Sequence, residues 1–455
     1  MLIYCTLFSI VILSCLIFYK RFTLSKKRAQ RKQQEYFETG LSKQTVAFLH
    51  PHCNAGGGGE KVLMCMIEKL QKTQKHNIVV YSAEEVDDQQ IIEKANTRFS
   101  THITNQDLKF IPILNKQLLE PKKRFTLLLQ IFGQMRYALK CVNSFQPDIF
   151  LDSTGLPFTF FIVKLLLPNV RVIAYVHYPF ISTDMISQVE KKEARYNNDD
   201  EITKSEGKTK LKLWYYKFLF FFYSLCGKMT EFAYVNSTWT YNHMKQTWKS
   251  TQLIKLFPPC QVDAFMRRKQ FTNQFIIISF AQFRPEKQHL LQIEIIEALV
   301  DRLPSEISQS IKLYMIGSCR NADDDLLFET IQDTINKKNL QDYISMHKNL
   351  PFQDIQKFLT SGMIGLHTME YEHFGITLVE MLAAGLIVVA HNSAGPKLDI
   401  LANDVGFLCE NLEDYVLSIV RIMQLTDEDR SRYQLMGRKQ AVNFSDESFK
   451  DLFNI

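Results

Sequence analysis

Two glutamates stand close together near the C-terminal end of the chain, in the stretch EHFGITLVE, where seven residues separate Glu372 from Glu380. The first precedes a Phe-Gly pair, and the second lies in the run ITLVEMLAAG, which predicts a helix ended by Gly385. The preceding run, GMIGLHT, is typical of a buried strand. The two carboxylates therefore flank the start of a helix, where backbone N–H groups lack partners within the helix.

The start of this helix is suited to binding an anion. The N–H groups of Gly375, Ile376 and Thr377 are expected to point outward there, at the positive end of the helix dipole. A partly buried carboxylate needs a polar partner, and the hydroxyls of a sugar or a ribose are suitable ones. Phosphate at the helix end and hydroxyls beside the acids together describe a sugar-nucleotide site.

Two cations follow an earlier predicted strand in the stretch FIIISFAQFRPEKQH. Arg284 would hold a diphosphate through its fork of donors, and Lys287 would act on it as a point charge. Taken alone these are ordinary surface charges. Their position after a buried strand makes them candidates, because parallel sheets bind ligands at the carboxyl ends of their strands.

A glycine-rich stretch, HPHCNAGGGGEKV, lies between the first predicted strand and a helix expected to begin near Glu60. Gly57 and Gly58 allow the backbone to approach a phosphate or a sugar closely. The stretch is neither a Walker A loop nor a spaced G-x-G-x-x-G. A plain tight turn is the alternative, but four successive glycines cost backbone entropy that a plain turn does not require.

Short apolar runs alternate with helical segments along the chain, which predicts parallel sheets covered on both faces. The expected strands are TVAFLHP, HNIVVYS, DLKFIPI, DIFLDST, RVIAYVH and EFAYVNS, then FIIISFA, IKLYMIG, YISMHK, GMIGLHT and LIVVAHN. The fold class is therefore α/β, with two doubly wound Rossmann-like domains, residues 44–263 and 264–455, facing each other across a cleft.

The N-terminal end carries an uncharged run, LIYCTLFSIVILSCLIFY, over residues 2–19. Its length is close to the roughly 20 residues that cross a bilayer, so residues 1–20 are predicted to form a transmembrane anchor. Seven basic residues follow between Lys20 and Lys32, before any acid, and place the rest of the chain in the cytosol. A buried core helix is the alternative.

The remaining charge is nearly balanced. Without those seven residues the chain has 47 basic against 48 acidic residues, which argues against a nucleic-acid-binding protein. The nine cysteines form no C-x-x-C pair and fit a reducing compartment.

Three further segments leave alternatives open. The aromatic run over residues 211–226 is either a buried core helix or a helix resting in a membrane interface, and residues 124–140 are a weaker candidate for the second role. The charged stretch 187–210 is either a functional loop or a tolerated insertion.

The two acids with Phe-Gly between them resemble the E-x7-E motif of retaining GT-B glycosyltransferases. Further stretches resemble the dolichol-pathway α-1,2-mannosyltransferase family, from about residue 44 to residue 400: HPHCNAGGGGEKVL, LDSTGLPFTF, AYVHYPFISTDM, FRPEKQH, GSCRN, EHFGI and AHNSAGPKLDI. The resemblance implies transfer of the fourth and fifth mannoses from GDP-mannose to the dolichyl-diphosphate oligosaccharide Man(3)GlcNAc(2)-PP-dolichol. It also implies the cytosolic face of the endoplasmic reticulum membrane, with other dolichol-pathway mannosyltransferases as partners.

The same resemblance implies roles for individual residues. Glu372 would contact the transferred mannose and Glu380 the ribose, while Arg284 and Lys287 would neutralise the leaving diphosphate. His177, in YVHYP, would stand beside the sugar. The remaining sugar-donor contacts would come from the two loops: Gly57, Gly58, Phe374, Gly375, Ile376 and Thr377.

The chain departs from the broader glycosyltransferase pattern in two places. Ala281-Gln282 replaces the usual Gly-Arg, so the phosphate contact of Arg284 is an inference, and the roles of Lys397 and Asp399 in AGPKLDI are open. No metal and no cofactor are expected. Asp323–Asp325 contain a D-x-D pattern but fit the first turn of a helix, where acids stabilise the dipole.

Three rival functions differ in chemistry. A membrane-bound GT-B hexosyltransferase with another sugar nucleotide would share every feature above. An NAD-dependent oxidoreductase would need a G-x-G-x-x-G after a strand and an acid about 20 residues later, which no strand offers. A scaffold without catalytic activity is disfavoured by the presence of Glu372, Glu380, Arg284 and Lys287 together.

Overall fold

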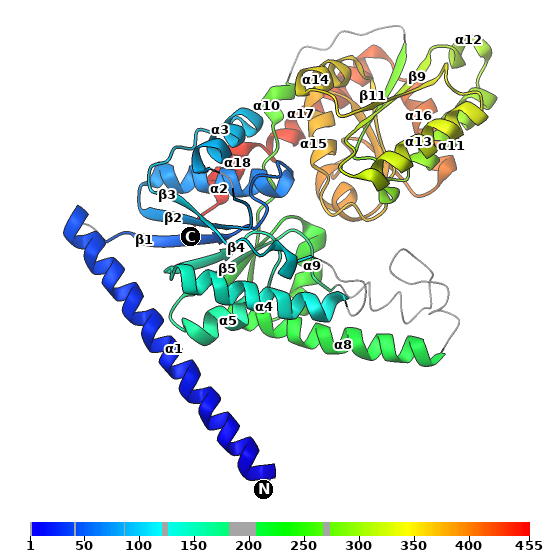
Figure 1. The fold of residues 1–455 in the computed structure, drawn as a ribbon. Helices are drawn as coiled ribbons and strands as arrows, with labels where there is room; N and C mark the ends of the chain where they lie inside the picture. Colours follow the sequence, from blue (N-terminus) through cyan, green and yellow to red (C-terminus); the bar gives the residue numbers. More distant parts are fainter. Residues whose placement is uncertain (1, 41, 86, 121–125, 182–205, 267–273) are drawn as a thin grey trace. The chain divides into compact units, whose positions relative to one another are not determined.

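The computed structural model describes residues 2–40, 42–85, 87–120, 126–181, 206–266 and 274–455 (Figure 1). The chain divides into two compact units. The first consists of Met1–Asn236 and Thr240–Leu256, and the second of Ser237–Trp239 and Phe257–Ile455. The predicted domain boundary, between residues 263 and 264, falls inside the short helix α10 (Val262–Phe265).

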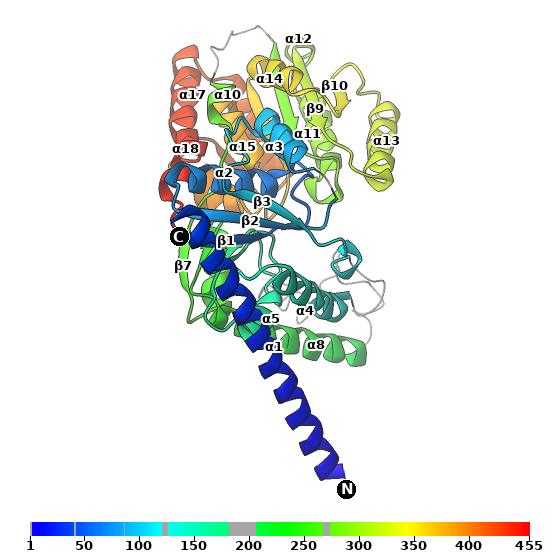
Figure 2. The ribbon, with the colours of Figure 1, turned by 60° about the vertical axis from the view of Figure 1, so that its left-hand side comes forward.

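The first unit is built on a seven-stranded parallel sheet in the order β3-β2-β1-β4-β5-β6-β7. The chain reverses direction across the sheet after β3, so right-handed crossovers place the helices before and after this point on opposite faces. Helices α2 and α3 cover one face, and α4, α5 and α8 cover the other (Figures 1 and 2). The elements are β1 (Gln44–Leu49), α2 (Gly58–Thr73), β2 (His76–Ser82), α3 (Asp88–Phe99), β3 (Leu108–Pro112), η1 (Lys116–Leu118), α4 (Thr126–Ser144), β4 (Ile149–Asp152), α5 (Thr159–Leu166), β5 (Arg171–Val176), α8 (Glu206–Met229), β6 (Phe232–Val235), α9 (Thr238–Thr247) and β7 (Gln252–Lys255).

The second unit has a six-stranded parallel sheet in the order β10-β9-β8-β11-β12-β13. One apolar core joins the sheet to α11, α13 and α16, and a second core joins its other face to α10, α14, α15 and α17. The elements are α10, β8 (Phe275–Phe280), η2 (Pro285–Lys287), α11 (His289–Arg302), α12 (Ser305–Ser308), β9 (Ile311–Gly317), α13 (Ala322–Lys337), β10 (Ile344–Lys348), α14 (Phe352–Ser361), β11 (Ile364–His367), α15 (Ile376–Ala384), β12 (Ile387–His391), η3 (Pro396–Ile400), β13 (Phe407–Cys409), α16 (Leu412–Met423), α17 (Asp427–Val442) and α18 (Asp446–Leu452).

Every strand expected from the sequence is present, which confirms two doubly wound parallel-sheet units. Two strands, β7 and β13, are present in addition to those predicted, and each lies at one edge of its sheet. Both are short, and an edge strand pairs on only one side, so neither needs the long apolar run that identifies a central strand.

The prediction of a transmembrane helix over residues 1–20 is not supported. Helix α1 (Leu2–Thr39) does not end after the apolar run but continues through the basic residues, where Arg28 and Lys32 pair with Asp148 of the first unit. Within the part of the chain that the structure describes, no helix has both the length and the apolar character that crossing a bilayer requires.

Candidate active site

The loop between β11 and α15 carries Glu372, and its conformation depends on a glycine. Gly375 has φ +105°, and a Cβ there would stand 2.3 Å from Cδ1 of Leu378. Helix α15 then runs from Ile376 to Ala384 and is terminated by Gly385, which has φ +80°, as predicted. The first N–H groups of α15 have no acceptor within the helix, which is the arrangement that the predicted anion site requires.

Glu372 and Lys287 form an ion pair in the second unit. The Lys287 Nζ atom lies 2.5 Å from Glu372 Oε2, and each side chain is only 15% exposed. The Nε2 atom of His367, a buried residue, lies 3.3 Å from the same oxygen, a close contact that is not an aligned hydrogen bond. The structure thus joins two of the predicted site residues, and it adds His367.

This environment keeps Glu372 ionised. Burial alone would raise its pKa, but the ion pair and hydrogen bond with Lys287, together with the His367 Nε2 atom beside the same oxygen, outweigh burial and hold the pKa far below its usual value. Burial also lowers the pKa of His367, which is therefore neutral near pH 7. Glu372 consequently acts as a hydrogen-bond acceptor and cannot supply a proton.

Lys287 is positioned by its backbone as well as by its charge. It ends the short 3₁₀ turn η2 after β8, and its carbonyl accepts a hydrogen bond from the hydroxyl of Thr368 at 2.8 Å. Thr368 is fully buried and follows β11, the neighbour of β8 in the sheet. Arg284 lies at the start of the same turn but pairs with Glu286 at 2.8 Å and is more exposed.

The loop after β12 supports the Glu372 loop from one side. The Gly395 N–H donates to the Glu372 carbonyl at 2.9 Å, and a Cβ at Gly395 would stand 2.4 Å from the Phe374 carbonyl oxygen. Asp399, for which the sequence predicts no role, accepts a hydrogen bond at 2.9 Å from the backbone N–H of Thr238, which belongs to the second unit. It therefore has a structural partner.

The side chains of Glu380 and Phe374, two further predicted site residues, are buried to different degrees. Glu380 lies in α15 and is half-buried. The ring of Phe374 is 3% exposed and packs against Phe257 and Phe444, so its side chain belongs to the core.

In the first unit, the glycine-rich loop is held by a buried histidine. Glu60 accepts a hydrogen bond from the Gly57 N–H at 2.6 Å, and its other oxygen lies 3.3 Å from His50 Nε2. His50 Nδ1 lies 2.9 Å from the hydroxyl of Ser153. One arrangement satisfies every group: the Ser153 hydroxyl donates to Nδ1, and His50 donates through Nε2 to Glu60.

His177 lies beside this network. Its Nε2 atom is 3.0 Å from the Ser153 carbonyl, to which it must donate, and this leaves Nδ1 as an acceptor. A Cβ at Gly59 would stand 3.8 Å from the His177 ring, so the glycine-rich loop and His177 are neighbours. Burial lowers the pKa of His177 from 6.5 to about 4, which makes the ring neutral near pH 7.

The depressed pKa of His177 predicts that the protein loses stability in mild acid. Between pH 6.5 and about 4 the unfolded chain binds this proton and the folded chain does not, so the free energy of unfolding falls as the pH falls. The expected loss from this group is on the order of 1 kcal/mol between pH 7 and pH 5. Urea unfolding at both values should show it, and His177→Asn should show a smaller decrease; an equal decrease in the variant would contradict the assignment.

The D-x-D pattern occupies the first turn of α13, as expected. Asp324 pairs with Arg320 at 2.9 Å, and Asp325 pairs with Lys348 at 2.6 Å. Among the described residues, no group of three or more acidic, histidine or cysteine side chains is arranged to hold a metal ion.

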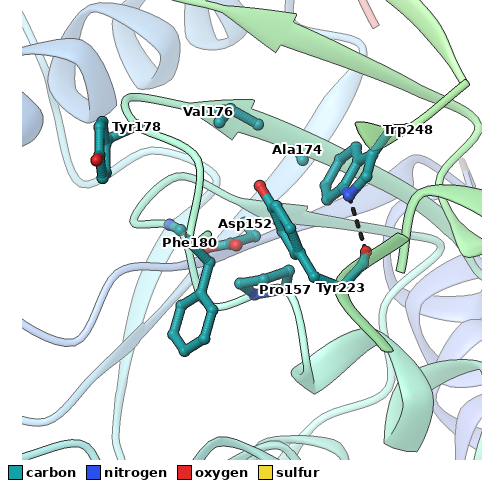
Figure 3. A pocket seen from close by; sticks show the side chains of 9 residues that line it. Asp152, Pro157, Ala174, Val176, Tyr178, Phe180, Tyr223 and Trp248 are labelled. Atoms are coloured by element: carbon teal, nitrogen blue, oxygen red, sulfur yellow. Dashed lines mark hydrogen bonds between the residues drawn. The ribbon is translucent and has the colours of Figure 1, made fainter. Parts of the chain in front are cut away.

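A small cavity lies at the ends of β4 and β5 (Figure 3). It is lined by Asp152, Tyr178, Phe180, Tyr223 and Trp248 among others, and its water-accessible space is about 10 Å³. That space holds about one water and no sugar. Asp152 instead accepts hydrogen bonds from the backbone N–H groups of the turn that follows it, Thr154, Gly155 and Leu156.

Sequence reasoning missed His50, Glu60, Ser153 and His367 as parts of these networks. His50 and His367 each end a strand or follow it directly, as His177 does. That shared position was the signal that could have found them, because strand ends are where parallel sheets bind ligands.

Two family models match the chain. ALG11 mannosyltransferase N-terminus matches residues 43–248, and Glycosyl transferases group 1 matches residues 262–440. The human protein named GDP-Man:Man(3)GlcNAc(2)-PP-Dol alpha-1,2-mannosyltransferase is 38% identical over 429 residues, which are 91% of this chain and 87% of the relative. The chain belongs to this mannosyltransferase family. A relative of the same name from Xenopus laevis is 37% identical over 453 residues, covering 96% of this chain and 92% of its own length.

Solved structures agree with the fold of the family. A glycosyltransferase from Rickettsia africae has a TM-score of 0.61 at 16% identity, covering 90% of this chain and 97% of its own. The sucrose-phosphate synthase of Thermosynechococcus elongatus has a TM-score of 0.65 at 13% identity, covering 90% of this chain and 96% of its own. With the two parallel sheets, these matches establish the α/β GT-B fold. The motif-based family assignment is confirmed.

Proposed function

We propose that this protein is a retaining mannosyltransferase that moves mannose from GDP-mannose, in α-1,2 linkage, onto Man(3)GlcNAc(2)-PP-dolichol. Relatives that carry this activity in their name are similar to it over nearly their whole length. The structural observation that carries the proposal is the buried Lys287–Glu372 pair beside the N-terminal end of α15. It places a cation, a carboxylate and helix-end amides around one loop.

The chemistry needs a leaving diphosphate to be stabilised while positive charge develops on the sugar. Lys287, Arg284 and the amides of Gly375 to Thr377 would receive the negative charge of the diphosphate. Because Glu372 stays ionised, it would accept hydrogen bonds from mannose hydroxyls and lie close to the developing positive charge. Glu380, half-buried in α15, would hold the ribose.

His177 would contribute through its neutral ring. With Nε2 donating to Ser153, Nδ1 is an acceptor for a sugar hydroxyl. The Glu60 contact to the Gly57 N–H would hold the glycine-rich loop close to the same histidine.

We place the protein at the cytosolic face of the endoplasmic reticulum membrane, where a dolichyl-diphosphate acceptor and GDP-mannose meet. Its cysteines support a reducing compartment, since those in the described part of the chain are free thiols. Other dolichol-pathway mannosyltransferases are its proposed partners there.

A screen of sugar donors tests this function. Purified protein with Man(3)GlcNAc(2)-PP-dolichol in detergent should transfer mannose from GDP-mannose, with no turnover of UDP-glucose or UDP-N-acetylglucosamine. Preference for another sugar nucleotide would support the rival hexosyltransferase and contradict the proposal.

Transfer is expected to continue after divalent cations are removed, because Lys287, Arg284 and a helix end would hold the diphosphate. Initial rates with EDTA should match those with magnesium within about twofold. A metal ion that stabilised the charge of the leaving diphosphate would instead lower the activation free energy by several kcal/mol, and its removal would slow transfer far more. Loss of activity in EDTA, with recovery on addition of manganese, would contradict this expectation.

A further inference from the structure

The glycine-rich loop of the first unit is fastened at two points. At its start, the Asn54 N–H donates to Glu84 at 3.0 Å, and the Asn54 carbonyl accepts from Lys94 Nζ at 2.6 Å. At its end, the Gly57 N–H donates to Glu60 at 2.6 Å. The second point involves a glycine that is predicted to approach the sugar donor, so the Glu60 contact sets the part of the loop that matters for binding.

His50 is the side chain that holds Glu60. It directly follows β1, is 1% exposed, and places its Nε2 atom 3.3 Å from Glu60 Oε1. Burial would raise the pKa of Glu60, but the hydrogen bonds from His50 and from the Gly57 N–H outweigh burial and hold the pKa below its ordinary value. Glu60 is therefore ionised near pH 7 and acts only as an acceptor.

The other ring nitrogen of His50 contacts the end of a second strand. Nδ1 lies 2.9 Å from the hydroxyl of Ser153, which directly follows β4. The carbonyl of the same serine lies 3.0 Å from His177 Nε2, directly after β5. Since β1, β4 and β5 are neighbours in the sheet (Figure 1), His50 connects the glycine-rich loop with the residue that holds His177.

The contacts of His50 decide where its ring carries a proton. An ionised carboxylate has no proton to give, so His50 must donate to Glu60 through Nε2. Nδ1 is then an acceptor for the Ser153 hydroxyl. That hydroxyl has a second acceptor within reach, the Leu49 carbonyl at 3.3 Å. The ring proton would therefore move to Nδ1 if Glu60 were replaced by a residue that donates to Nε2.

We infer that His50 is a positioning residue for sugar transfer, which acts through Glu60 to fix the Gly57 end of the glycine-rich loop beside His177. It is buried and acts through its neighbours, without contact to the sugar donor. The inference deepens the proposed function and rests on it, because it names the group that keeps the loop in its donor-binding position. A displacement of about 1 Å in such a loop is enough to slow a reaction strongly.

Two substitutions separate the contacts of the ring. In His50→Gln the amide N–H reaches the place of Nε2 and donates to Glu60, while the Ser153 hydroxyl turns to the Leu49 carbonyl. In His50→Asn the shorter side chain keeps the contact to Ser153 and leaves Glu60 without this donor. We expect His50→Asn to lower kcat/KM for GDP-mannose about tenfold or more, and His50→Gln to lower it at most about threefold.

Hydrogen exchange tests the position of the loop without any substrate. Exchange of the Gly57 N–H should accelerate about tenfold in His50→Asn and stay near the parent rate in His50→Gln. The strands of the sheet should keep their protection in both variants, which distinguishes a displaced loop from a destabilised unit. His76→Asn is the matched control, because His76 begins β2 at the amino ends of the strands. It should change neither exchange in the loop nor transfer.

Glu60→Gln provides a spectroscopic signature. The new amide oxygen accepts from the Gly57 N–H and its NH2 group donates to His50, so the ring proton should move from Nε2 to Nδ1. Nitrogen-15 chemical shifts of histidine-labelled protein distinguish the two forms, and His50→Gln identifies the His50 signals by their loss. Should His50→Asn fail to fold, the position of this proton in Glu60→Gln decides by itself.

Three outcomes would overturn the inference: full activity in His50→Asn, equal losses in the two His50 variants, or an unchanged ring proton in Glu60→Gln. Loop exchange and the position of the ring proton need neither GDP-mannose nor acceptor. If both behave as expected while the parent protein transfers no mannose, the proposed function fails and the role of His50 in holding the loop stands.

Discussion

Glu372→Gln is expected to lower kcat about a hundredfold, the usual loss when one preorganised electrostatic group is removed from an active site. Glutamine keeps the size of the side chain but removes the negative charge that faces Lys287 and His367. The lost charge acts on the transition state, so kcat should fall more than the KM for GDP-mannose rises. GDP affinity should not weaken, because Lys287 loses a partner that competes with the diphosphate.

Glu380→Gln is the matched variant, since it makes the same chemical change in helix α15, which directly follows the loop that carries Glu372. If Glu380 holds the ribose, GDP binding should weaken by about 1.5–3 kcal/mol. Calorimetry with GDP and steady-state transfer assays on both variants separate the two roles. Equal weakening of GDP binding by both substitutions would mean that the two acids do not divide the sugar from the ribose.

Gly395→Ala is expected to lower kcat/KM by about a hundredfold without touching a substrate-binding side chain, because a displacement of about 1 Å in a catalytic loop has that cost. The backbone of Gly395 has φ −60° and ψ −47°, which alanine adopts readily. The new Cβ, however, would stand 2.4 Å from the Phe374 carbonyl oxygen and 2.6 Å from Phe374 Cα. Backbone atoms cannot rotate away, so the Glu372 loop must move.

Gly437→Ala provides the control for this prediction. Gly437 lies in α17 of the same unit, and a Cβ there would stand 3.0 Å from the flexible end of Leu382. This variant should keep its activity and be as stable as the parent or slightly more so, because alanine favours a helix interior by about 1 kcal/mol. Transfer rates and thermal unfolding of both variants check the comparison. Full activity in Gly395→Ala would show that the contact does not position Glu372.

Local sequence patterns predict most of the strands and the ends of helix α15. The alternation of apolar runs with helical segments predicted the central strands, because a strand buried on both faces needs a continuous apolar run. Gly375 and Gly385 marked the two ends of α15, since both positions require a positive φ. The E-x7-E spacing then placed one acid before this helix and one within it.

What the sequence could not decide was which distant groups meet. Lys287 and Glu372 lie 85 residues apart and form a pair because β8 and β11 are neighbours in the sheet, although β9 and β10 separate them along the chain. His50, Glu60 and Ser153 meet for a similar reason, since β1 lies beside β4. Strand order follows from packing of whole elements, not from local propensity.

Helices α1 and α8 also show which features local sequence determines and which depend on tertiary packing. The apolar run at residues 2–19 predicted a helix correctly, but its continuation through basic residues that pair with Asp148 depends on a contact more than a hundred residues away. The aromatic run at residues 211–226 is apolar on nearly every side, so its sequence alone could not separate a buried face from an exposed one. Only packing against the sheet buried Tyr223 and left Trp214 exposed, because a helix on a sheet covers one of its sides and leaves the other to its surroundings.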